Sequence, residues 1–311
     1  MTRPREWTAD ARARARDLHW LARRAVRGDP FGRHPGRDVG PGIEFSQYRP
    51  YEPGDDARWL DWQRLARGQD PLIRLAPREA RVTVSVVLDT SGSMAEPASV
   101  ATPDWTRMDC ARALAATVLA IARRQGDAFH WLRLDAVTAG AALSGHATPG
   151  HSDAHLATCV AALSDLVPAR EWPPVHTLRD ALQRLPKAGL VLMISDFIAD
   201  SPATDALAGV LSAGRRDVIA LQILTRDEVD FGYRGNVEFV DRETGERRRA
   251  HSDAARAAYL ENLARARRQL RRAFLRRGAA FESVLAEQSP DDILRPVLHA
   301  YQRARAARGL E

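Results

Sequence analysis

The stretch RVTVSVVLDTSGSM, residues 81–94, decides the fold class of this chain. Its first half, Val82 to Leu88, is a nearly unbroken run of apolar and β-branched residues that stops at Asp89. A short run of this kind is typical of a strand buried on both faces, as strands of parallel sheets are. The second half, Asp89 to Ser93, is typical of a tight turn, because Gly92 lets the backbone fold sharply.

Strand and helix patterns alternate after this stretch. Two more apolar runs of strand length follow, Leu190–Ser195 and Val218–Leu224, and the first of them also stops at an acidic residue, Asp196. Another strand is expected at Ala128–Leu134. Helical periodicity predicts helices at residues 109–124, 155–166, 178–185 and 203–213. This alternation predicts an α/β fold with a doubly wound, mostly parallel sheet that helices cover on both faces.

The chain on either side of this core has other patterns. We predict an N-terminal helix and a loop-rich extension with β pieces at residues 1–79, packed on a main domain at residues 80–311. A β-hairpin insertion is expected at about residues 225–250 of the main domain. The remaining expected elements are a helix at 10–27, helical turns at 59–67, a strand at 72–75, a long Arg-rich helix at 253–277, a strand at 281–285 and a closing helix at 290–308.

Composition narrows the class of protein. The chain has 311 residues, of which 45% are hydrophobic and 28% charged, as in ordinary globular proteins. No run reaches the roughly 20 apolar residues of a membrane span, and the first residues lack the apolar core of a secretory signal, so a cytoplasmic protein is expected. Cys110 and Cys159 have no metal-type spacing and are expected to be buried free thiols.

Two acidic residues carry the expected chemistry. Asp89 and Asp196 each end an apolar strand, and if those strands are neighbours, the two carboxylates meet at one edge of the sheet. Such a pair needs a cation or a proton between its members. The Asp-x-Ser-x-Ser spacing adds the hydroxyls of Ser91 and Ser93, and Thr177 offers a third. Hard oxygen ligands favour Mg²⁺, with Mn²⁺ or Ca²⁺ as alternatives. Taken singly, each motif is also compatible with a helix cap or a Ser/Thr turn.

The stretch Asp89-Thr90-Ser91-Gly92-Ser93-Met94 resembles the metal-ion-dependent adhesion site (MIDAS) of von Willebrand factor A domains. The resemblance implies a von Willebrand factor A-like, Rossmann-type fold and a cation that a partner's carboxylate completes. The metal ligands that it implies are Asp89, Ser91, Ser93, Thr177 and Asp196. Thr158 and Ser164 are less well placed alternatives to Thr177.

A second resemblance covers nearly the whole chain. Several motifs resemble the hallmark stretch of the bacterial domain-of-unknown-function 58 family: Gly42–Phe45, Tyr48–Tyr51, Pro53–Asp56, Arg58, Leu60–Trp62 and Ala66–Arg67. Asp241–Glu246 resembles a later motif of that family. The resemblance implies a MoxR-type AAA+ ATPase as a partner in chaperone-like assembly or maturation of other proteins. The loop at residues 95–108, with Asp104 and Trp105, is longer than the family pattern.

Other classes of function remain as alternatives. The sequence has no Gly-x-Ser-x-Gly elbow, P-loop or Gly-x-Gly-x-x-Gly motif, and we identify no catalytic residue. A carboxylate-bound metal is compatible with a phosphoester hydrolase. The net charge of +6 is compatible with nucleic-acid binding, but nearly all basic residues are arginines scattered among Ala and Leu, which is typical of solvated helix faces. The mixed charges around Asp61 fit either a partner surface or a bracing ion-pair network, which we favour.

Overall fold

A computed structural model describes ten parts of the chain: residues 47–53, 57, 60–75, 82–134, 143–144, 148–168, 175–198, 201–213, 215–240 and 245–306. The helix predicted at residues 10–27 and the motif Gly42–Phe45 lie outside them. The described residues belong to two compact units, a smaller one up to residue 75 and a larger one from residue 82 onward, which are described separately.

The larger unit is built on a six-stranded sheet in the order β10-β7-β6-β3-β4-β5. Its strands are β3 (Thr83–Asp89), β4 (Ala128–Leu134), β5 (Leu143–Ser144), β6 (Ala188–Ser195), β7 (Arg215–Leu224) and β10 (Ala280–Leu285). All neighbours run parallel except β5, which pairs antiparallel with β4 at one edge. The prediction of a doubly wound, mostly parallel sheet is confirmed. From β3 the chain moves outward to β4 and later returns to the other side of β3 with β6, so the strand order reverses at β3.

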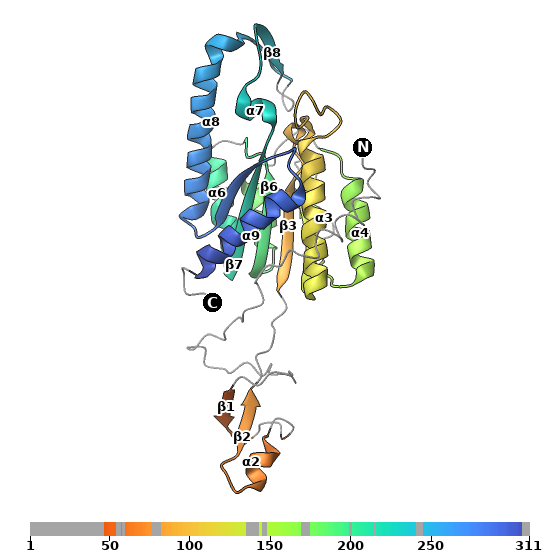
Figure 1. Cartoon of the computed structure of the whole chain (residues 1–311), viewed down its shortest axis with the longest axis vertical. Helices are drawn as coiled ribbons and strands as arrows, with labels where there is room; N and C mark the ends of the chain where they lie inside the picture. The colour runs from red at the N-terminus through yellow and green to blue at the C-terminus, as the bar shows by residue number, and fades with distance from the viewer. Residues whose placement is uncertain are drawn as a thin grey trace. The chain divides into compact units, whose positions relative to one another are not determined.

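Helices cover both faces of this sheet (Figure 1). On one face α3 (Arg107–Gln125) packs against α4 (Asp153–Ser164) and α9 (Pro290–Ala306). On the other face α6 (Ser201–Leu211) packs against α5 (Val175–Gln183) and α8 (Ser252–Leu275). Each of these helices overlaps the range that periodicity predicts for it.

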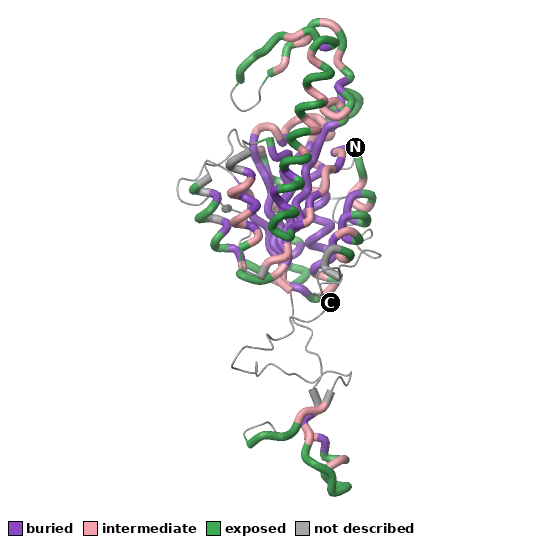
Figure 2. Tube along the Cα trace, turned by 90° about the vertical axis from the view of Figure 1, so that its left-hand side faces the viewer, coloured by how far each residue is buried: buried purple, intermediate pink, exposed green. Residues whose placement is uncertain are grey.

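The core lies on the central strands, as the buried tube in Figure 2 shows. Val84, Val86, Val87 and Leu88 of β3 have no exposed surface. Alternate residues of a strand point to opposite faces, and both faces of this one are covered, which explains why the run is almost continuously apolar. Val87 belongs to the hydrophobic cluster that α6 and α8 complete.

Helix α3 begins two residues before its predicted start. Thr106 caps it in a reciprocal capping box: its hydroxyl accepts the Asp109 N–H at 3.2 Å, and the Asp109 carboxylate accepts the Thr106 N–H at 2.9 Å. Gly126 ends the helix in the left-handed conformation. The earlier start matters for function, because it makes Arg107 the first helical residue.

Three short elements of this unit have no counterpart in the sequence prediction. They are the edge strand β5, the 3-10 helix η2 (Gly92–Ala95) and the short helix α7 (Arg226–Asp230). Each is too short to establish a hydrophobic period. The predicted hairpin is present as β8 (Asn236–Val240) paired with β9 (Arg247–His251).

The smaller unit contains a two-stranded sheet of β1 (Gln47–Pro50) and β2 (Leu72–Leu75), with α2 (Trp62–Ala66) between them in the chain. Asp61 caps α2 by accepting two backbone N–H groups, and it also accepts the Tyr48 hydroxyl at 2.7 Å. These contacts hold α2 to β1, which is the bracing role that we favour for Asp61. Strand β1 was not predicted, whereas β2 was.

In the residues that the structure describes, none of the helices has both the length and the apolar character of a membrane span.

Gly189 is the glycine of the sheet that tolerates no side chain. Its φ is +128°, and a Cβ atom added there would lie 2.2 Å from the Thr83 carbonyl oxygen of the neighbouring strand. We expect Gly189→Ala to lower the free energy of unfolding by about 2 kcal/mol or more, because strained backbone alone costs about 1–3 kcal/mol. Gly126→Ala is the control, since its φ is +76° and nothing lies within 4 Å of the added Cβ. Equal losses in denaturant unfolding would contradict the role of the Thr83 contact.

Candidate functional site

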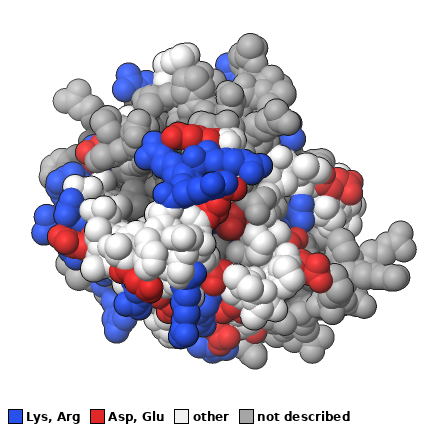
Figure 3. Space-filling model, turned by 90° about the horizontal axis from the view of Figure 1, so that it is seen from above, with Lys and Arg blue, Asp and Glu red and all other residues white. Residues whose placement is uncertain are grey.

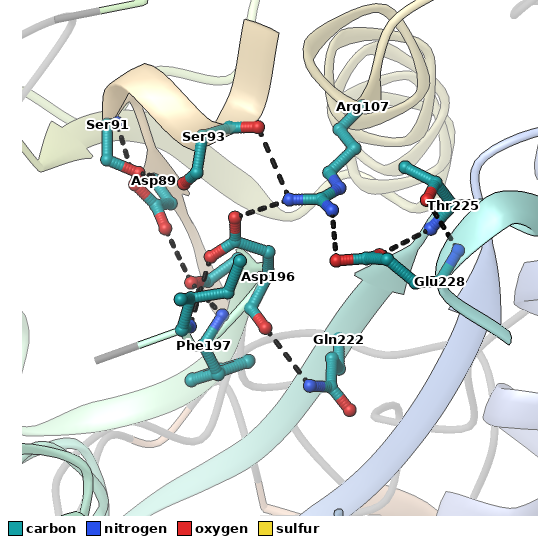
Figure 4. A network of polar contacts seen from close by, with 11 residues as sticks. Asp89, Ser91, Ser93, Arg107, Asp196, Phe197, Gln222, Thr225 and Glu228 are labelled. Atoms are coloured by element: carbon teal, nitrogen blue, oxygen red, sulfur yellow. Dashed lines mark hydrogen bonds and ion pairs between the residues drawn. The ribbon is translucent and has the colours of Figure 1, made fainter. Parts of the chain in front are cut away.

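Two buried acidic side chains lie at the carboxyl edge of the sheet (Figure 4). β3 and β6 are parallel neighbours with Leu88 opposite Ile194, so the residues that end them emerge side by side. Asp89 ends β3, and Asp196 directly follows β6. The strand order reverses here, which is the kind of position where open α/β sheets bind ligands.

The turn after β3 gathers polar groups around Asp89. Ser91 donates its backbone N–H to Asp89 Oδ1 at 2.8 Å, and the hydroxyl oxygens of Ser91 and Ser93 are 3.0 Å apart. Thr90 is directed to β4, because its hydroxyl donates to a carbonyl there at 2.6 Å. Thus one carboxylate and two hydroxyls lie together and Thr90 lies apart, which matches the alternation in Asp-x-Ser-x-Ser.

Ser195 joins this group, although sequence reasoning gave it no role. Its hydroxyl donates to Asp89 Oδ2 at 2.5 Å and accepts the Phe197 N–H at 2.8 Å. The last residue of β6 therefore connects Asp89 with the backbone of the loop that follows Asp196. The signal available in the sequence was its place directly before Asp196, where a hydroxyl must lie at the same sheet edge.

Burial and, to a lesser extent, the negative charge of Asp196 raise the pKa of Asp89 to about 7. Hydrogen bonds from Ser195 and Ser91 act in the opposite direction. The folded protein therefore resists ionising Asp89 below neutral pH. A cation placed beside it would remove that resistance, because it supplies the missing positive charge.

Arg107 is a charged residue of the site that sequence reasoning missed, and so is its partner Glu228. Arg107 donates to Asp196 Oδ2 at 2.7 Å and to the Ser93 carbonyl at 3.3 Å, and it forms an ion pair with Glu228 Oε1 at 2.5 Å. Its side chain is only 3% exposed. Burial lowers its pKa, but Glu228 and Asp196 outweigh burial and raise it overall, so the guanidinium stays charged.

The loop after β6 is held from several sides. Asp196 Oδ1 accepts the Ile198 N–H at 3.2 Å, and the Asp196 carbonyl accepts Gln222 Nε2 of β7 at 3.0 Å. Phe197 has a left-handed φ of 53°, which is rare for a residue with a side chain. Its ring is buried against Phe274 and Phe281. These contacts fix the position of the Asp196 carboxylate.

Thr177, the third hydroxyl of the predicted site, lies in the first turn of α5 rather than before a helix. Its side chain is outside the part of the chain that the structure describes. The two alternatives are engaged elsewhere: Thr158 Oγ1 donates to the Ala154 carbonyl and Ser164 Oγ to the Val160 carbonyl, both within α4. Thr177 stays a prediction, and its two alternatives lose support.

The long loop before α3 is bonded to neighbouring elements near the site. The Val100 N–H donates to Asp227 Oδ2 at 2.9 Å, and the Trp105 indole donates to the Ala286 carbonyl at 2.8 Å. Asp104 is exposed. The loop is therefore tied to α7 and to the end of β10.

The remaining candidates serve packing. Cys110 and Cys159 are buried free thiols, as predicted. Among the described residues there is no group of three or more His, Cys, Asp and Glu that could hold a metal. The Asp89 site differs from such a group because its ligands would include hydroxyls.

The chain is similar in sequence to two mycobacterial proteins. The uncharacterized proteins Rv1480 of Mycobacterium tuberculosis (strain ATCC 25618 / H37Rv) and Mb1516 of Mycobacterium bovis (strain ATCC BAA-935 / AF2122/97) are each 29% identical to this chain over 236 residues. These regions cover 75% of this chain and 71% of each relative. Their names state no activity.

Solved structures similar to the chain include a von Willebrand factor type A protein from Catenulispora acidiphila, at 15% identity and a TM-score of 0.39, covering 75% of this chain and 44% of that one. An aerotolerance-related membrane protein from Bacteroides fragilis NCTC 9343 has 14% identity and a TM-score of 0.44, covering 71% and 99%. At these identities nothing about activity or partners transfers.

The family model described as "Protein of unknown function DUF58" matches residues 47–269. That range includes the turn after β3, Arg107, Asp196 and the β8–β9 hairpin. It spans well over half of the chain and agrees with the family resemblance seen in the sequence. The chain therefore belongs to the DUF58 family.

Proposed function

We propose that this protein is a protein-interaction module that binds a divalent cation, Mg²⁺ in the first instance, at the carboxyl edge of its sheet. The proposed ligands are Asp89, Ser91, Ser93, Thr177 and Asp196. Mn²⁺ and Ca²⁺ are alternative ions. A carboxylate of a partner protein would complete the coordination.

One observation carries this proposal. Asp89 is a fully buried carboxylate whose described hydrogen bonds come from the neutral groups of Ser91 and Ser195, while a second carboxylate raises its pKa. A buried acid with this environment needs either a proton or a cation at neutral pH. The hydroxyls of Ser91 and Ser93 beside it are the hard oxygen donors that Mg²⁺ prefers. The donor set therefore fits the ion.

The partner is a finer part of the proposal. The family resemblance favours a MoxR-type AAA+ ATPase, with which this protein would act in chaperone-like assembly or maturation of other proteins. A bound cation would supply positive charge for a partner's carboxylate. The protein's own contribution would be to hold the oxygen ligands in place through the turn after β3 and the loop after β6.

The two other classes of function receive less support. A phosphoester hydrolase needs groups free to act on substrate, but the basic residue at this site, Arg107, is buried and already bonded to two carboxylates. Nucleic-acid binding needs uncompensated basic surface. Figure 3 shows a basic cluster bordered by acidic side chains, and in the hairpin Arg247 and Arg249 both pair with Glu238.

The test combines metal binding with partner binding. We expect calorimetry to detect Mg²⁺ or Mn²⁺ binding to the wild type, and Asp89→Ala to abolish it. The wild type should then bind a purified MoxR-type AAA+ ATPase only while the metal is present. Asp153→Ala is the control, because it removes an exposed carboxylate paired with Arg123. Association that survives both EDTA and Asp89→Ala would exclude a metal-mediated contact.

A further inference from the structure

Arg107 is an internal cation at the proposed metal site. It starts α3, far in sequence from the acidic residues it contacts, and its guanidinium bridges Asp196 of the β6 edge and Glu228 of α7 (Figure 4). A charge taken out of water to this extent is costly unless its partners surround it. The paired carboxylates provide that compensation.

In this arrangement Asp196 has two possible partners that compete, the guanidinium of Arg107 and the proposed metal ion. Its Oδ2 atom already accepts the 2.7 Å hydrogen bond from Arg107. The same guanidinium donates to the backbone carbonyl of Ser93 at 3.3 Å, so it touches two of the residues proposed as metal ligands. A divalent cation bound there has a positive charge as its neighbour, and like charges at short range inside a protein repel strongly.

Glu228 acts on the other side of the guanidinium. A capping box fixes it: Glu228 Oε2 accepts the Thr225 N–H at 2.8 Å, and the Glu228 N–H donates to the Thr225 hydroxyl at 3.2 Å. The other carboxylate oxygen, Glu228 Oε1, takes no part in the capping box and pairs with Arg107. Glu228 therefore neutralises part of the charge that Arg107 would otherwise direct at a metal.

We propose that Arg107 is a positioning residue that holds Asp196 and opposes the metal, and that Glu228 sets how strongly it does so. This inference rests on the metal site proposed above. It predicts effects of opposite sign for two residues that form one ion pair. Removing the charge of Arg107 tightens metal binding, and removing the charge of Glu228 weakens it. Damage to the fold of the site would weaken binding in both cases.

The experiment measures Mn²⁺ binding to the full chain from the electron paramagnetic resonance signal of the free ion. We expect Arg107→Met to lower the dissociation constant by about tenfold or more and Glu228→Gln to raise it by about threefold to tenfold, as a unit charge a few ångströms away implies. Arg107→Lys keeps the charge, so its dissociation constant should lie closer to that of the wild type than the Arg107→Met value does. Arg226→Met is the matched control: it removes a positive charge from α7, where Arg226 pairs with Glu287 and not with Asp196.

The outcomes separate this inference from the proposed function. If the wild type binds Mn²⁺ but Arg107→Met binds more weakly, or Glu228→Gln does not weaken binding, the role of Arg107 is overturned and the metal site stands. If only Arg107→Met binds Mn²⁺, the metal site of the wild type is overturned, and Arg107 takes the place of the ion. If no variant binds, both are overturned. Should Arg107→Met fail to fold, the sign of the Glu228→Gln effect decides.

Discussion

At pH 8 and without metal, the Asp89→Asn protein is expected to unfold at a higher temperature than the wild type, by roughly 5–10 °C. Burial and the charge of Asp196 raise the pKa of Asp89 from 3.8 to about 7 in the folded protein. Because the pKa is raised in the folded state, this group contributes stability that is fully present below its unfolded pKa of 3.8 and is lost progressively as pH rises from 3.8 through 7. The loss amounts to about 4 kcal/mol for this shift. Asparagine removes the charge and still accepts the N–H of Ser91.

Thermal unfolding at pH 5 and pH 8, each with and without Mg²⁺, measures this effect. The wild type should lose stability from pH 5 to pH 8 and regain it when Mg²⁺ is added at pH 8. Asp89→Asn should show neither change. Asp153→Asn, an exposed carboxylate, controls for general charge effects. Equal unfolding temperatures of wild type and Asp89→Asn at pH 8 would mean that the buried carboxylate needs no cation.

Phe197→Ala is expected to lower the free energy of unfolding by about 3–5 kcal/mol, as loss of a buried phenylalanine ring does. The ring is 5% exposed and packs edge-on against Phe274 at 5.5 Å between centroids. The same residue follows Asp196 directly, so its ring anchors the loop that holds this carboxylate. Metal affinity should therefore fall together with stability.

Denaturant unfolding and Mn²⁺ titration of the same preparation check both effects of Phe197→Ala. Ile198→Ala is the matched control, because this next residue is 63% exposed and loses little packing. A Phe197→Ala protein that is destabilised but binds metal as the wild type does would show that the loop keeps its position without the ring. A loss below about 1 kcal/mol would contradict the anchoring role altogether.

The strands were predictable because burial on both faces leaves a strong local signal. β4 was predicted at the bounds that the structure has, and β3 and β6 differ from their predicted ranges by one or two residues. The short elements β5 and α7 were not predicted. Their few residues carry no period, and contacts with other elements stabilise them.

The sequence by itself determined the sheet-forming runs, the acidic residue that follows two of them and the spacing of Ser91 and Ser93, because these are local patterns of apolar and polar residues. Only the tertiary structure decided that β3 and β6 are neighbours and that Ser195, Arg107 and Glu228 meet at their ends. Arg107 is one arginine among many in the sequence. What distinguishes it is its burial between two carboxylates, and burial is a property of the packed chain.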